Sequence, residues 1–371
     1  MRLRLCAPLA IAAFVSFLLG SAESLAQNAY VAAGGFSQIV GVLDTATNTL
    51  IARIPDCCGP FRIAAIPGGS RVYVTQTFPA PTTVNVIDTA TNEVIAKIPL
   101  IQPGDLAAKP DGSRVYVTGA GTDFAGAVSV IATATNGVIA TIPVSAASGI
   151  AVTPDGSKVY VSANPVSVIN TATNRVVASI PISATGAVAV TPDGSKVYIA
   201  GSVGLYVIDT ATNAVTATIP LGVNDVAVSP DGSKVYVTGL LAGQRFAGVS
   251  VIDAATNVVI ATVDGFLSAA TLAVTPDGGK LYVTDPSPDV IGVIDTATNA
   301  VTGYIFGLDN PVDVSIPGPL VFAGTPGTAN CIGQSVSALA QGFGGLNAAA
   351  VTLGFSSVGA LQDAIMAFCG R

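Results

Sequence analysis

Short apolar runs separated by turn-forming residues recur along most of this chain. In one representative repeat the runs cover Gly149–Thr153, Lys158–Ser162, Pro165–Ile169 and Arg175–Ile180. Val, Ile, Tyr and Thr dominate these runs, as is typical of packed β-strands. A Pro-Asp-Gly turn follows the first run, where Pro presets φ and Gly adopts a positive φ without strain. The pattern predicts four short antiparallel strands in each repeat.

A five-residue phrase lies between the third and fourth runs of each repeat. It reads DTATN at 44–48, 88–92, 209–213 and 295–299, ATATN at 132–136, NTATN at 170–174 and DAATN at 253–257. The seven starts are 38 to 44 residues apart, a spacing typical of propeller blades and solenoid units. The hydroxyl and amide groups can bond to the local backbone, and Asn tolerates a left-handed conformation. We therefore interpret the phrase as a hairpin turn and not as a ligand site.

These repeats predict an all-β chain, a seven-bladed β-propeller of four-stranded antiparallel blades, with a short α-helical C-terminal appendage. Blades that pack face to face bury both sides of most strands, which agrees with 50% hydrophobic and 10% charged residues. The runs are too short for a membrane barrel, whose strands need roughly 9–11 residues. The chain opens with Ala29–Ala33 and the last repeat closes with Val312–Ile316, so both ends should share one blade. Leu320–Ala323 competes with Ala29–Ala33 for the last place in that blade.

The recurring sequences SKVYVT, VSVIDTATN, VIATIP and GIAVTPDG resemble the YVTN family of β-propeller repeats over residues 28–324. This resemblance implies a secreted propeller similar to surface-layer proteins, and it implies no particular activity. The segment that follows is similar to a small two-cysteine module found at the C-termini of some secreted proteobacterial proteins.

Three regions are expected along the chain: a signal peptide at 1–26, the propeller at 27–323 and the helical module at 324–371. Arg2 and Arg4 precede an apolar stretch, and small residues at Ser24 and Ala26 suit a cleavage site. We therefore expect export to the periplasm, the cell surface or the extracellular space, with no membrane span in the mature chain.

The C-terminal segment is rich in Ala, Leu, Gly and Ser, and helices are predicted at Ile332–Gln341, Leu346–Leu353 and Val358–Phe368. Ser356 or Ser357 could cap the last of these. So short a segment has a small core, and a Cys331–Cys369 disulfide would close it.

Two further cysteines are adjacent, at Cys57 and Cys58. They could form a redox-labile vicinal disulfide, bind a soft metal poorly, or serve as a structural pair joined to each other or to a partner.

The composition excludes several functional classes. The chain contains no His and no Trp, which excludes a histidine base, ligand or haem site. Because Arg2, Arg4 and Glu23 precede residue 27, the mature chain has 13 basic and 21 acidic residues, a net charge of −8. Such an acidic chain without a basic block is a poor binder of nucleic acid.

The position five residues before each turn proline should begin the inner strand of each blade. Around the ring it reads Arg62, Asp105, Gly149, Ala187, Asp225, Thr271 and Val312. Arg62, Asp105 and Asp225 are the charged members and the candidate binding residues. An Arg62–Asp105 salt bridge between neighbouring blades is the simpler interpretation of that pair.

Three long loops between the second and third strands carry further candidate binding residues, namely Phe78, Asp123, Phe124, Arg245 and Phe246. Exposed aromatic and charged residues on loops of a rigid scaffold suit recognition, although the phenylalanines could instead fold back over the blade edges. Calcium held by Asp285 and Asp289 is a weak further candidate.

A tyrosine six residues after the turn proline recurs around the ring, and we expect it to pack between blades. The set is Tyr73, Tyr116, Tyr160, Tyr198, Tyr236 and Tyr282, with Tyr30 as its seventh member.

Three functions are compatible with these features. The first is an exported non-enzymatic scaffold whose loop face binds a protein or a cell-surface glycan. The second is a lactonase or quinone-dependent propeller enzyme that uses Asp and Arg at the channel mouth. The third is a structural protein of the cell surface. No catalytic residue, metal or other cofactor is assigned.

Overall fold

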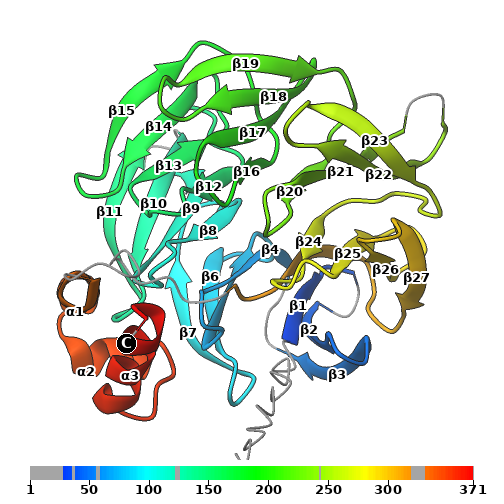
Figure 1. Ribbon diagram of the computed structural model, residues 1–371. Helices are drawn as coiled ribbons and strands as arrows, with labels where there is room; N and C mark the ends of the chain where they lie inside the picture. Colours follow the sequence, from blue (N-terminus) through cyan, green and yellow to red (C-terminus); the bar gives the residue numbers. More distant parts are fainter. Residues whose placement is uncertain are drawn as a thin grey trace, which may run out of the picture.

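The computed structural model describes residues 28–35, 38–55, 59–121, 126–241, 244–318 and 331–370. Seven four-stranded antiparallel sheets are arranged radially around a central channel, which confirms the seven-bladed propeller (Figure 1). We number the blades 1 to 7 along the ring, beginning with the blade that contains the first strand. The innermost strands of neighbouring blades contact one another all the way around the ring.

Each blade has four strands, from the channel to the rim. The inner strands are β28 (Pro311–Ser315), β4 (Pro60–Ala65), β8 (Leu106–Ala108), β12 (Ile150–Val152), β16 (Val188–Val190), β20 (Asp225–Val228) and β24 (Leu272–Val274). The second strands are β1 (Asn28–Ala33), β5 (Arg71–Gln76), β9 (Arg114–Ala120), β13 (Lys158–Val161), β17 (Lys196–Gly201), β21 (Lys234–Leu240) and β25 (Lys280–Asp285). The third strands are β2 (Ile39–Asp44), β6 (Thr83–Asp88), β10 (Gly126–Ala132), β14 (Val166–Asn170), β18 (Gly204–Asp209), β22 (Ala247–Asp253) and β26 (Val290–Asp295). The outer strands are β3 (Thr49–Ile54), β7 (Glu93–Pro99), β11 (Gly137–Pro143), β15 (Arg175–Ile180), β19 (Ala214–Ile219), β23 (Val258–Val263) and β27 (Ala300–Ile305).

Blade 1 is built from both ends of the propeller sequence, as expected. Strand β28 supplies its inner strand and pairs antiparallel with β1, so that Val314 lies opposite Val31. Strand β1 therefore takes the second place in this blade, and the competing segment at 320–323 lies outside the described residues. The expected boundaries after residues 26 and 323 also lie outside them.

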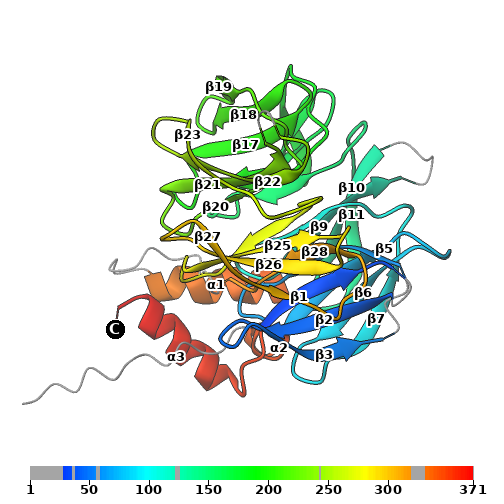
Figure 2. The same cartoon turned by 90° about the vertical axis from the view of Figure 1, so that its right-hand side faces the viewer.

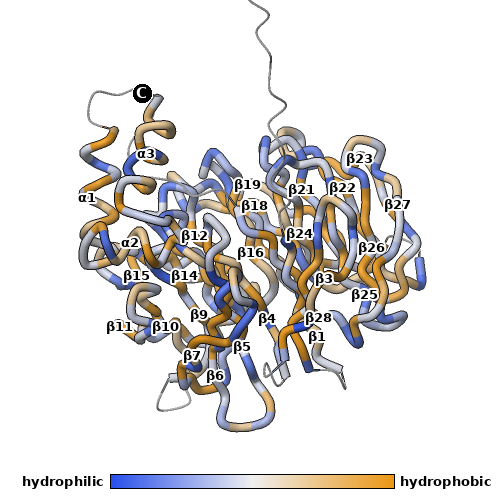
Figure 3. Tube along the Cα trace, turned by 90° about the horizontal axis from the view of Figure 1, so that it is seen from below, coloured by the Kyte–Doolittle hydropathy of each residue, from blue (hydrophilic) through white to orange (hydrophobic). Residues whose placement is uncertain are grey.

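The hydrophobic residues lie mainly in the strands and the hydrophilic ones at many of the turns (Figure 3). The second and third strands of each blade are buried on both faces, whereas the outer strands alternate between exposed and half-buried residues. The tyrosines of the second strands are at most 1% exposed and lie between blades, which confirms their packing role. The core is thus divided into seven similar layers between blades.

The repeated phrase forms the hairpin between third and outer strands. Its final Asn has a φ between 51° and 59° in all seven copies, a left-handed conformation that Asn adopts at little cost. At Asn170, the side-chain oxygen accepts hydrogen bonds from the amides of Ala172 and Thr173, each at 3.0 Å. The hydroxyl of Thr171 donates to the Gly156 carbonyl at 2.6 Å and so joins the two turns of one blade. The turn interpretation is therefore confirmed.

The same phrase also joins neighbouring blades, through contacts that its local turn chemistry does not predict. Four tyrosine hydroxyls donate to the last Asn of the next blade. These bonds are Tyr73–Asn136 at 2.9 Å, Tyr160–Asn213 at 2.8 Å, Tyr198–Asn257 at 3.4 Å and Tyr282–Asn48 at 2.6 Å. We call each of them a tyrosine latch. They lie at the interfaces 2–3, 4–5, 5–6 and 7–1.

The C-terminal segment forms helices α1 (Cys331–Phe343), α2 (Leu346–Thr352) and α3 (Val358–Phe368), close to the predicted ranges. Figure 2 shows them packed on one side of the propeller. The Ser70 hydroxyl donates to the Thr352 carbonyl at 2.6 Å, and Ala134 packs against the helical core. Both propeller residues lie in turns of the repeat, so the helices cover the turn side of blades 2 and 3.

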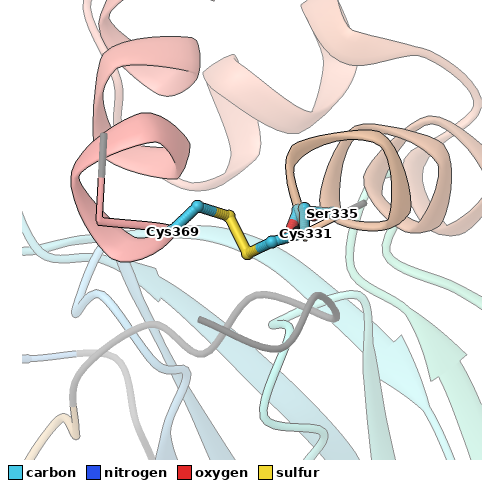
Figure 4. The surroundings of a disulfide bond; sticks show 3 residues. All are labelled: Cys331, Ser335 and Cys369. Carbon is cyan, nitrogen blue, oxygen red and sulfur yellow. Dashed lines mark hydrogen bonds between the residues drawn. A yellow bond between two sulfur atoms is a disulfide. The ribbon is translucent and has the colours of Figure 1, made fainter. Parts of the chain in front are cut away.

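A disulfide closes this module, as predicted. Cys331 begins α1 and Cys369 follows α3, with a Cα–Cα distance of 5.8 Å (Figure 4). Both cysteines belong to the core that the three helices share. The side chain of Ser357 accepts a hydrogen bond from the Ala360 amide and caps α3. Among the described residues, no helix is long and apolar enough to cross a membrane.

Candidate functional site

The candidate site is a polar cavity at one mouth of the central channel, on the loop face. This face carries the loops that enter the inner strands and those that join second to third strands, opposite the helical module. The cavity has a volume of about 640 Å³ and includes Arg62, Asp105, Asp225 and Asp313 in its lining. The structure therefore brings together all three charged ring residues that the sequence singled out.

The fourth charged member of the ring is Asp313, where the sequence analysis placed Val312. Asp313 pairs with Ala32, two positions after Tyr30, just as Asp225 pairs with Thr238, two positions after Tyr236. The last repeat has one residue fewer between this position and its turn proline. Counting back from the proline therefore gave the wrong residue, whereas counting along the sheet register from the buried tyrosine would have found Asp313.

Each of the three aspartates joins two neighbouring inner strands through both carboxylate oxygens. Asp105 accepts from the amide of Leu106 at 2.9 Å and from that of Ile150, in the next blade, at 3.1 Å. Asp225 accepts from Val226 at 2.8 Å and Leu272 at 2.9 Å.

Asp313 repeats the arrangement, accepting from Val314 at 2.9 Å and from Ile63 at 2.8 Å. We call each of these arrangements an aspartate clamp. They occur at the blade interfaces 1–2, 3–4 and 6–7.

These three interfaces are the ones that have no tyrosine latch. In the described part of the chain, the buried Oδ1 atoms of Asn92, Asn174 and Asn299 accept no hydrogen bond, nor does the Tyr116 hydroxyl form one. The seven interfaces therefore fall into two kinds, clamped at the channel mouth or latched at the turn side.

The expected salt bridge between Arg62 and Asp105 is not formed. Within the described ranges the single ion pair is Lys109–Asp111, at 2.6 Å. The Arg62 guanidinium lies 4.5 Å from the centre of the Phe61 ring, and its Nη1 atom donates to the Phe61 carbonyl at 3.5 Å. Because the clamps direct the carboxylates towards backbone amides, the guanidinium keeps most of its donors available in the cavity.

The cavity environment disfavours the charged form of all three carboxyls. Burial raises the pKa of Asp225 to about 6 and that of Asp313 to about 7, against the effect of the amide donors and Arg62. Burial likewise raises the pKa of Asp105. Each of these carboxyls also feels at least one other member of the group, so the aspartates and Arg62 form one electrostatic cluster.

Small residues at two of the uncharged ring positions leave room for the cavity. Blades 4 and 5 contribute Gly149 and Ala187, which leave space beside the charged residues. A Cβ atom at Gly149 would clash with the Gly186 carbonyl oxygen of the next blade. The absence of a side chain there is therefore required by the close approach of blades 4 and 5.

The long loops present exposed aromatic residues on the same face. Phe78 is 69% exposed and Phe246 56% exposed, so neither folds back over its blade edge. Arg245 is exposed next to Phe246. Phe246 lines a second cavity of about 340 Å³ together with Leu241, Phe266 and Leu267. The candidates Asp123 and Phe124, like Cys57 and Cys58, lie outside the described residues.

The two aspartates considered for calcium act as backbone acceptors. Asp285 is 1% exposed and accepts from the amides of Leu267 and Ser268, each at 2.8 Å. Asp289 accepts from the Asn310 amide at 2.7 Å. The described residues contain no group of three or more acidic or cysteine side chains placed to hold a metal. Calcium binding by this pair stays an untested prediction.

Comparison with known proteins shows the fold and nothing finer. No protein-family model matches the chain, and no curated protein sequence matches it. A functionally unknown protein from Desulfotomaculum acetoxidans is 20% identical, with a TM-score of 0.64 over 79% of this chain and 99% of that one. Kuenenia stuttgartiensis hydrazine synthase is 24% identical, with a TM-score of 0.62 over 69% of this chain and 89% of that one.

A candidate 6-phosphogluconolactonase from Bacteroides fragilis is 14% identical, with a TM-score of 0.62 over 79% of this chain and 99% of that one. These likenesses show the propeller fold alone. The likeness to YVTN repeats therefore stays a resemblance of sequence phrases.

Proposed function

We propose that this protein is an exported, non-enzymatic propeller scaffold that binds a polar group of a protein or glycan at the channel mouth on its loop face. The observation that carries the proposal is the cavity of about 640 Å³ with Arg62 and three aspartates in its lining. Its volume lies within the roughly 300–1,000 Å³ of small-molecule sites, and a few convergent polar groups commonly fix a ligand in such sites.

The surrounding loops support recognition of a larger partner. Phe78, Arg245 and Phe246 stand exposed on the face that carries the cavity. Aromatic and arginine side chains are enriched where proteins bind partners. A glycan or polypeptide could thus insert one polar group into the cavity while its flanking units contact these loops.

Two observations support export. The Cys331–Cys369 disulfide suits an oxidising compartment, since thiols stay reduced in the cytosol. The sequence phrases that resemble secreted YVTN propellers agree with this. A periplasmic or cell-surface location is therefore part of the proposal.

Filling the cavity tests the proposed site. We expect Ala187→Phe to abolish binding of whichever polar probes bind the wild type, measured by saturation-transfer NMR with neutral sugars, amino acids and polyamines. Ala172→Phe is the matched control, because Ala172 is exposed on the opposite, turn side. Equal binding by the Ala187→Phe variant, or no binding of any probe to the wild type, would reject the channel mouth as the binding site.

A second candidate function is hydrolysis of a lactone at the same cavity. The pKa of Asp225, about 6, suits proton transfer near neutral pH. A candidate lactonase also shares the fold. Turnover of sugar lactones by the wild type that is lost in Asp225→Ala would favour this enzyme over the non-enzymatic scaffold.

A further inference from the structure

The channel mouth offers hydrogen-bond donors and acceptors that are not joined to one another in salt bridges. The Arg62 guanidinium is held against Phe61 at 4.5 Å and forms no ion pair within 4.0 Å with any described carboxylate. The three aspartates each accept one amide hydrogen on each oxygen, which leaves further lone pairs directed elsewhere. A ligand can therefore find both kinds of partner in one cavity.

The open side of the cavity adds polar groups without charge. Ser148 and Thr185 line it beside Gly149 and Ala187, from the loops that enter blades 4 and 5. The Thr118 hydroxyl, also in the lining, already donates to the Ser148 carbonyl at 2.7 Å. A ligand on this side meets small residues, hydroxyls and backbone groups, with Asp105 and Asp225 in the flanking blades 3 and 6 and with Arg62 and Asp313 across the channel.

The balance of these groups selects against several ligand classes. A simple anion is disfavoured because it would face three carboxyls against one guanidinium. A simple cation would be attracted by the carboxyls, but it would leave the Arg62 donors without an acceptor. An apolar ligand would leave buried polar groups without water or partners. A neutral molecule with several hydroxyls satisfies both sets, because each hydroxyl donates to a carboxylate and accepts from a guanidinium or amide.

We infer that the ligand of this cavity is a neutral polyhydroxylated ring, such as the terminal sugar of a glycan, bound between Arg62 and Asp313 on one side and blades 4 and 5 on the other, with Asp105 and Asp225 at its flanks. This inference rests on the proposed function and names its ligand class. Phe61, 39% exposed at the cavity, adds an aromatic surface for the apolar C–H face of the ring.

Hydroxyl groups that donate to Asp225 favour its ionised carboxylate over the protonated form, so binding should release protons around and below about pH 6. The charged and titratable groups that face the ligand are Arg62 on β4, Asp105 before β8, Asp225 on β20 and Asp313 on β28. Affinity for a neutral sugar should accordingly fall as the pH drops below 6.

The test uses the full-length mature protein and three probe sets at pH 7.5: neutral disaccharides (maltose, cellobiose and lactose), spermidine and citrate. We expect titration calorimetry to detect a disaccharide, and Arg62→Ala and Asp225→Asn each to weaken it by at least about tenfold, as loss of a hydrogen bond to a charged group predicts. Arg175→Ala is the control, because Arg175 is exposed on an outer strand.

Each result decides between the two proposals. Binding of spermidine or citrate without any disaccharide overturns the sugar assignment and leaves the binding cavity standing. Disaccharide binding that Arg62→Ala does not alter also overturns it, because the sugar then lies elsewhere. No heat and no saturation transfer with any probe overturns both proposals.

Discussion

At the scale of single residues, the buried tyrosines differ in whether the hydroxyl group forms a hydrogen bond. All seven occupy the same place in their blades and are almost fully buried. The Tyr160 hydroxyl donates to Asn213, whereas the Tyr116 hydroxyl has no partner among the described residues. Identical side chains therefore contribute differently to stability, according to whether their interface is latched.

This difference predicts that the same substitution, Tyr to Phe, changes the stability of the fold at a latched interface but not at a clamped one. Tyr160→Phe should lower the free energy of unfolding by about 1–3 kcal/mol, because it leaves the part-buried Asn213 oxygen without its donor. Tyr116→Phe should be neutral or slightly stabilising, since it removes a buried hydroxyl that forms no bond. Denaturant unfolding of the two variants measures both effects, and equal losses would contradict the latch.

Residue chemistry also sets the limit of what the sequence could predict. The left-handed Asn of each turn and the Ser357 cap follow from local preferences, and both were predictable. The tyrosine latch joins residues more than fifty positions apart, as in Tyr160 and Asn213, so no local pattern shows it. Asp313 was missed because the closing repeat is one residue shorter, which shifts a count made from its proline.

At the scale of elements, every outer strand carries a β-bulge just after its turn. In blade 3, for example, Ile131 pairs with Val138 and Val130 with Ala140, so Ile139 is the extra residue. Its side chain is 51% exposed. A bulge twists an edge strand away from regular pairing, which protects it from adding another strand. The outer strands carry few charges that could prevent such pairing. The bulges therefore protect this apolar rim of the propeller against the addition of further strands.

The helical module is the element whose stability depends most on one covalent bond. Reducing the Cys331–Cys369 disulfide should destabilise the module by on the order of 3–4 kcal/mol, because it releases a loop of 38 residues. Hydrogen exchange should then rise in α1–α3, while the second strands of the blades stay protected. Unchanged protection of the helices, or a parallel rise in the blades, would contradict this independence.

At the scale of the whole molecule, aspartates with raised and with lowered pKa values change the free energy of unfolding with pH in opposite directions. Burial raises the pKa of Asp225 and Asp313, so the folded chain binds these protons more tightly than the unfolded one. Their contribution is fully present below about pH 4 and is lost as the pH rises through about 6 and 7. In contrast, the Ser229 hydroxyl and Ser233 amide lower the pKa of Asp231 to about 2.

The contribution of Asp231 is present above about pH 4 and is lost as the pH falls through about 2.

The melting temperature should therefore be highest near pH 4–5 and decline towards pH 7.5. Asp313→Asn should flatten the decline, although its amide can keep only one of the two clamp bonds. Asp363→Asn, on the exposed side of α3, is the control. A melting temperature that rises from pH 4.5 to 7.5 would contradict the assignment.

The direction of the latches has a consequence for the history of the chain. Each repeat carries the tyrosine donor on its second strand and the asparagine acceptor on its third-to-outer turn. It can therefore donate to the next blade and accept from the preceding one. A tandem gene duplication of such a unit would supply the donor and the acceptor together. The two copies could then form a latch without a substitution in either. The clamped interfaces depend instead on a single Asp at the inner-strand start, which three of the seven repeats carry, so a copy of a repeat without it would bring only the latch.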